Sequence, residues 1–93
     1  MTVQTVLLFE YPKNPAHYGS QEWRVYEHLV ARGEVYGNEF LNMIPPIPEY
    51  RSRINRLRHL LKPLGWWIDS IPVKGIRFNM FKIVKYEERR LAA

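Results

Sequence analysis

Apolar residues recur at helical spacing in two segments of the chain. In the first, Ser20 is a good N-cap, and a glycine suited to end a helix stands at position 33. Four apolar residues lie between them at helical spacing, Trp23, Tyr26, Leu29 and Val30. The second segment runs from about residue 49 to residue 62 and places one apolar stripe on a single face, formed by Tyr50, Ile54, Leu57 and Leu61. The pattern therefore predicts two amphipathic helices, over about residues 20–32 and 49–62.

Between these two helices the sequence predicts a short extended segment and a short helix. Residues 34–36 are extended, and Asn38 is the expected N-cap of a helix that buries Phe40, Leu41 and Ile44. Three prolines between positions 45 and 48 must end this helix, because proline lacks the backbone N–H that a helix interior needs.

A β-hairpin is predicted after the second long helix. Its strands cover residues 66–73 and 76–84, and Lys74-Gly75 forms the tip. Trp66 and Trp67 alternate across the first strand, so one ring enters the core while the other packs laterally or contacts a partner. A further strand or extended arm is predicted over residues 2–11, followed by a turn over residues 13–19.

This order of elements predicts an α+β fold of the winged-helix type. A three-helix helix-turn-helix core is followed by a two-stranded β-hairpin wing, with an extra N-terminal strand or arm. The expected organisation is an N-terminal strand or arm and turn over residues 1–19, a winged helix-turn-helix domain over 20–86 and a C-terminal tail over 87–93.

Composition narrows the class of protein. The chain has 93 residues, of which 46% are hydrophobic, which is enough for one domain with its own core. Cysteine is absent, which excludes a disulfide scaffold, a thiolate zinc site and a cysteine nucleophile. No apolar run is long enough to span a bilayer, and no signal peptide is recognised, so we expect a cytoplasmic protein that does not engage a membrane.

Charge is distributed unevenly along the chain. Residues 1–49 carry three basic against six acidic residues, whereas residues 50–86 carry nine basic residues against Asp69. A polarised domain of this kind favours a polyanion as the partner of its basic half.

The helix predicted over residues 49–62 carries the candidate chemistry. Arginine and asparagine donate to base edges, and serine and lysine bind phosphates. With Ile54 at the centre of the buried face, the opposite face and its borders present Arg51, Ser52, Asn55, Arg56, His59 and Lys62. The hairpin adds Lys74, Arg77 and Lys82 as electrostatic contacts. These nine residues form the predicted binding site for double-stranded DNA, and we expect the arginines between positions 51 and 58 to lie along one accessible helical ridge.

Several of these segments resemble a known family. The segment 52–58 (SRINRLR), followed by 64–68 (LGWWI) and 71–78 (IPVKGIRF), is similar to the small winged helix-turn-helix domain proteins of phages and prophages. The similarity covers about residues 20–84. It implies a winged-helix fold and DNA binding, with residues 51–58 in the recognition helix, in a regulator of phage or mobile-element transcription, excision or replication.

Two departures from that family pattern keep other functions open. The segment 44–48 is apolar and stiff, and Glu49 stands at the front of the recognition helix. Both features also suit a phage-encoded protein-interaction module that inhibits a host protein complex. Alternatively, the strand over residues 2–11 adds to a neighbour's sheet in a larger nucleoprotein assembly or across a homodimer.

Catalysis and metal binding are not expected. The histidines at positions 17, 28 and 59 have no metal-ligand spacing, and the basic half offers Asp69 as its one carboxylate. We therefore expect a binding protein without a cofactor or metal.

Overall fold

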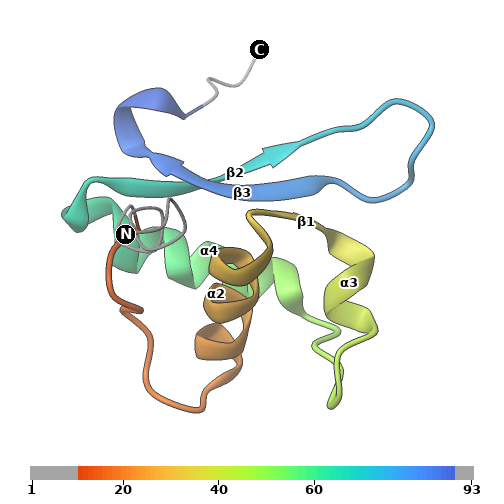
Figure 1. The fold of residues 1–93 in the computed structure, drawn as a ribbon, viewed down its shortest axis with the longest axis horizontal. Coiled ribbons are helices and arrows are strands. Elements are labelled where there is room, and N and C mark those ends of the chain that lie inside the picture. The colour runs from red at the N-terminus through yellow and green to blue at the C-terminus, as the bar shows by residue number, and fades with distance from the viewer. Residues whose placement is uncertain (1–10, 90–93) are drawn as a thin grey trace, which may run out of the picture.

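Two layers form the part of the protein that the computed structural model describes, residues 11–89 (Figure 1). Within these residues the helical layer contains α2 (Gln21–Arg32), α3 (Gly37–Leu41) and α4 (Tyr50–Leu61). The second layer is a sheet of β1 (Glu34–Tyr36), β2 (Trp66–Ile71) and β3 (Met80–Lys85). Single 3₁₀ turns, η1 (Lys62–Leu64) and η2 (Tyr86–Glu88), follow α4 and β3. The expected α+β class is confirmed, whereas the strand expected over residues 2–11 lies outside the described residues except for Tyr11.

The sheet is antiparallel, with strand order β1-β3-β2. Ile68 of β2 pairs with Ile83 of β3, and Val35 of β1 pairs with Phe81 of β3. Directly paired residues share a face of the sheet, so these four side chains lie on the same face. All four are buried there in one core with the helices. In Figure 1 the helices α2 and α4 lie on one side of the sheet, and the β2–β3 loop extends beyond them on the side of α3.

Helix α2 has the boundaries that its capping residues predict. The Ser20 hydroxyl accepts a hydrogen bond from the Trp23 backbone N–H at 3.1 Å. Gly33 ends the helix with a φ of 81°, and its N–H donates to the Leu29 carbonyl at 2.8 Å. On the buried face the Tyr26 hydroxyl donates to the Pro12 carbonyl at 2.6 Å, and burial raises the pKa of Tyr26. This hydrogen bond ties the segment before α2 to the helix.

Helix α4 also follows its predicted pattern. Its buried residues are the expected stripe of Tyr50, Ile54, Leu57 and Leu61. Pro63 lies in the 3₁₀ turn η1, and Gly65 ends that turn in the left-handed conformation with a φ of 86°. The proline and glycine therefore end the helix where the sequence predicted.

The prediction for α3 was wrong in two respects. The helix begins at Gly37 with Tyr36 as its N-cap, and the Glu39 carboxylate accepts from the Tyr36 N–H at 2.9 Å. Leu41 and Ile44, which were expected in the core, are 38% and 95% exposed. The helix stops at Leu41, and the proline-rich segment folds back so that the Ile47 N–H donates to the Phe40 carbonyl at 2.9 Å. Ile47 is therefore buried in their place.

The hairpin strands are shorter than predicted. The ladder ends at the pair Ile71–Met80, which leaves residues 72–79 as a loop. A tight turn at its tip is confirmed, since the Ile76 N–H donates to the Val73 carbonyl at 3.1 Å and Gly75 has a φ of 79°.

The two adjacent tryptophans lie on opposite faces of the sheet. Trp66 packs against the core, with its ring 5.8 Å from that of Tyr11. Trp67 packs laterally on the other face, with its ring 5.4 Å from that of Tyr86. The alternation that the sequence predicted is confirmed, and both rings have partners inside the molecule.

The start of α3 approaches α4 closely. A Cβ atom added to Gly37 would lie 2.5 Å from the Tyr50 hydroxyl oxygen, so no larger residue fits without movement. The Gly37 N–H also donates to the Asn79 carbonyl at 3.0 Å. One glycine thus joins α3 to α4 and to the foot of the β2–β3 loop.

Candidate nucleic-acid interface

One face of α4 is open to solvent along its whole length. We call it the α4 ridge, and it consists of Arg51, Ser52, Asn55, Arg56, His59 and, in the turn that follows, Lys62. All six side chains were predicted from helical periodicity, and all six are exposed. No aspartate or glutamate occurs within α4, so the ridge combines cations with neutral hydrogen-bonding groups. Such a surface is chemically suited to a polyanion.

Two further arginines of α4 do not lie on the ridge. Arg53 turns toward α2, where its Nε donates to Gln21 Oε1 at 2.9 Å and its Nη1 lies 3.0 Å from Glu22 Oε2. Its Nη2 lies 3.6 Å from Glu49 Oε2. Arg53 therefore serves the contact between α2 and α4.

Arg58 turns the other way, toward the edge strand β2. Its Nε donates to the Ile68 carbonyl at 2.8 Å, and its guanidinium lies 5.3 Å from the centre of the Trp67 ring. Burial lowers the pKa of Arg58, and the charge of the buried Asp69 partly opposes that effect. The expectation that all arginines between 51 and 58 share one accessible ridge is wrong for Arg53 and Arg58, because neighbouring elements bind both.

The other two arginines remain accessible. Arg51 lies with its guanidinium 5.9 Å from the centre of the Tyr50 ring and is exposed. The Arg56 side chain is 72% exposed, and its Nη1 lies 3.6 Å from Glu22 Oε2. These two cations are the ones on α4 that a ligand reaches most readily.

The three basic residues predicted in the hairpin lie in different places. Lys74 and Arg77 are exposed in the β2–β3 loop, beyond the end of the ladder. Lys82 lies within β3, where its cross-strand neighbours are Glu34 and Asp69. Because Phe81 and Ile83 face the core, the alternation of β3 directs Lys82 to the sheet face opposite α4. The structure thus separates Lys82 from the other predicted site residues.

A hollow lies between α4 and the hairpin, and its rim is polar. Ile54 and Phe81 contribute its apolar lining, and the polar lining comes from Arg51, Asn55, Arg58, Ser70 and Asn79. Asn79 Nδ2 donates to Ser70 Oγ at 2.8 Å, which links the end of the β2–β3 loop to β2 beside α4. Ser70 and Asn79 were not among the predicted site residues. The alternation of the predicted first strand is the sequence signal that could have identified Ser70, because it places Ser70 on the same face as Ile68.

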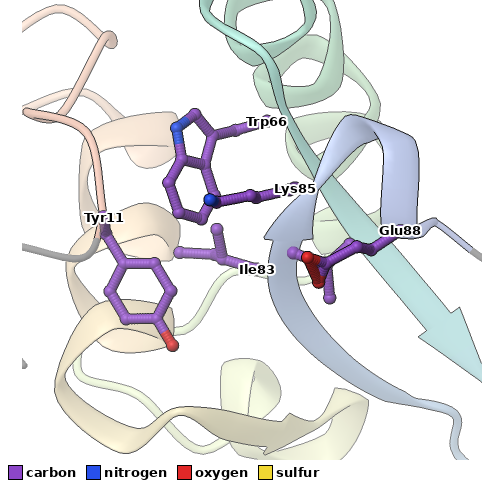
Figure 2. Close-up of a pocket in the computed structure, with 6 residues that line it drawn as sticks. Tyr11, Trp66, Ile83, Lys85 and Glu88 are labelled. Atoms are coloured by element: carbon purple, nitrogen blue, oxygen red, sulfur yellow. The ribbon is translucent and has the colours of Figure 1, made fainter.

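A second hollow lies at the far end of β3 (Figure 2). Figure 2 shows Tyr11, Trp66 and Ile83 around the same space, which Lys85 and Glu88 also line. One cation and one anion balance each other here. This hollow therefore does not extend the basic surface of the α4 ridge.

Within residues 11–89, no three histidine, cysteine, aspartate or glutamate side chains gather as metal ligands would. No helix in the same range is sufficiently long and apolar to cross a bilayer. Comparison with known proteins found no match to this chain among protein-family models, curated proteins or solved structures.

Proposed function

We propose that the chain is a winged-helix protein that binds double-stranded DNA through the α4 ridge. In this proposal α4 is the recognition helix and enters the major groove, and the β2–β3 hairpin is the wing. The order of helices and strands and the β1-β3-β2 sheet support the winged-helix assignment. The observation that carries the proposal is the row of six exposed basic and hydrogen-bonding side chains along one acid-free helix and the turn that follows it.

Each member of the ridge has a role that its chemistry favours. Arg51 and Arg56 donate to guanine or to phosphates, and Asn55 pairs with adenine. Ser52, His59 and Lys62 bind the sugar-phosphate backbone. Lys74 and Arg77 of the loop contact the backbone beside the groove that α4 occupies. The resemblance to phage domains extends the proposal to the control of transcription, excision or replication.

Fluorescence anisotropy with a labelled random-sequence duplex tests the proposal. If about six phosphates are neutralised, the logarithm of affinity falls with the logarithm of salt concentration at a slope of about −5. Arg56→Ala is expected to weaken binding about tenfold. The matched control is Arg32→Ala, which removes an exposed arginine that pairs with Glu39 at 3.7 Å, away from α4. Equal affinities of wild type, Arg51→Ala and Arg56→Ala would exclude the ridge as the binding face.

A second candidate function is a protein-interaction module on the same scaffold. The observation in its favour is the apolar turn between α3 and α4, where Ile44 is 95% exposed beside three exposed prolines. Retention on a duplex-DNA column separates the two functions. Weak retention that does not change with salt would favour a protein partner, such as a host complex that the protein inhibits.

A further inference from the structure

An acidic side chain of α2 reaches the border of the α4 ridge. Glu22 lies in the first turn of α2, and its side chain is 12% exposed. Its Oε2 atom lies 3.0 Å from Arg53 Nη1 and 3.6 Å from Arg56 Nη1. One carboxylate oxygen therefore contacts two arginines from adjacent turns of α4.

The two arginines are held to different degrees. Arg53 has Gln21 and Glu49 as additional partners, and its side chain is 24% exposed. Among the described residues, Glu22 is the one ion-pair partner of Arg56, whose side chain is 72% exposed. Arg53 therefore keeps Glu22 in place, and Arg56 is the partner that can leave it for a ligand.

Glu22 stays ionised at neutral pH. Burial alone would raise the pKa of Glu22, but hydrogen bonds from its own backbone N–H and from Arg53, with the charges of Arg53 and Arg56, outweigh this effect. The net result is a pKa below the ordinary value of 4.5. A permanent negative charge thus adjoins the surface that we propose for DNA.

We propose that Glu22 is a specificity-determining residue of the DNA interface, which acts by restraining Arg56. This inference rests on the proposed function. Leaving Glu22 costs Arg56 one ion-pair contact whichever DNA group it binds, so this cost alone does not discriminate between sequences. A phosphate that Arg56 binds also brings a second anion close to the Glu22 carboxylate, which repels it. A guanine edge offers Arg56 two hydrogen bonds and carries no net charge, so it escapes this repulsion. Glu22 thereby lowers affinity for random duplex more than affinity for a preferred sequence.

The test compares Glu22→Gln with Glu27→Gln. Both variants remove one carboxylate charge from α2, but Glu27 is exposed and hydrogen-bonded to Asn14 at 3.0 Å, outside the α4 contact. For a labelled random-sequence duplex, Glu22→Gln is expected to bind on the order of threefold more tightly than wild type. Its salt slope steepens by up to about one. Selection from a random duplex pool yields a weaker consensus with Glu22→Gln than with wild type.

A double-mutant cycle identifies the route of the effect. In an Arg56→Ala background, Glu22→Gln is expected to lose most of its gain, because the restrained side chain is gone. If the gain persists unchanged, or if Glu22→Gln binds random duplex no better than Glu27→Gln, the inference is wrong. Absence of wild-type binding to any duplex overturns the proposed function itself.

Thermal melting verifies that each variant is folded. Should Glu22→Gln fail to fold, Glu22→Asp replaces it in the same titration. The shorter side chain withdraws the carboxylate from Arg56, so random-duplex affinity is expected to rise above that of Glu27→Gln, by less than threefold. No rise in this variant also contradicts the inference.

Discussion

Arginines occur both on the α4 ridge and on the two flanks of the same helix, but their surroundings differ. On the ridge, Arg51 and Arg56 are exposed. On the flanks, Arg53 is bound by α2, and Arg58 is bound by β2. Four arginines within eight positions thus divide into two that are available to a ligand and two that hold α4 in place.

A short basic helix such as α4 needs contacts that hold it against the rest of the domain. The exposed arginines of the ridge repel one another and bury no apolar surface. The contacts that stabilise α4 must therefore come from its other faces. Its apolar stripe supplies burial, and the flanking arginines add directional bonds to both neighbouring elements. Under the proposed function, stability and binding are therefore assigned to different side chains, which makes them separable by mutation.

The largest expected effect is on stability. Arg58→Ala removes the hydrogen bond to the Ile68 carbonyl and the contact with Trp67, and it leaves the buried Asp69 without this compensating charge. We expect the free energy of unfolding to fall by about 2 kcal/mol, measured by urea denaturation. Arg51→Ala is the control from the ridge and is expected to change it by less than about 0.5 kcal/mol. Similar losses in both variants would remove the distinction between ridge and flank.

The next effect concerns the hairpin. Under the proposed function, the double variant Lys74→Ala/Arg77→Ala weakens duplex binding about fivefold and makes the salt slope shallower by about two. Lys82→Ala serves as the comparison, because Lys82 lies on the sheet face opposite α4 between Glu34 and Asp69. Its duplex affinity is expected to stay within about twofold of wild type. If Lys82→Ala lowered duplex affinity by more than this, Lys82 would have to be part of the interface.

The smallest effect sharpens the role of the α2 flank. Because the folded-state pKa of Glu22 is lowered, ionised Glu22 stabilises the fold at pH values above its ordinary 4.5. This contribution is lost as the pH falls through the lowered pKa. The stability difference between wild type and Glu22→Gln, expected to be under about 1 kcal/mol, should therefore shrink from pH 6 to pH 3 in urea titrations. A constant difference would mean that the charge of Glu22 contributes nothing.

Periodicity alone was enough to predict much of α4. Twelve residues with one apolar stripe define both the buried face and the exposed one, so the five ridge residues within α4 followed directly, and Lys62 continues the same face into the next turn. The same pattern could not separate Arg53 and Arg58 from the other arginines. Their positions depend on Glu22 and Ile68, which lie 31 and 10 residues away in the chain.

Short elements were predicted less well. In α3 the apolar residues Leu41 and Ile44 continued a helical pattern, but the backbone turned before that pattern could bury them. In the hairpin, alternation continued past Ile71 and Met80, where the ladder stops. Helix ends and strand ends are set by tertiary contacts, such as the bond between Ile47 and Phe40, that a local pattern does not contain.

Gly37 determines how closely α3 approaches the start of α4 and the base of the β2–β3 loop. With a hydrogen atom in place of a side chain, it lets the Tyr50 hydroxyl approach α3 while its own N–H holds the Asn79 carbonyl. A methyl group at this position would clash with Tyr50 and push the first turn of α4 away from α3 and the base of the β2–β3 loop. The spacing between the helix and the loop tip would then change without any loss of charge. Under the proposed function, α4 and the loop would no longer match the spacing of their two contacts on a rigid duplex.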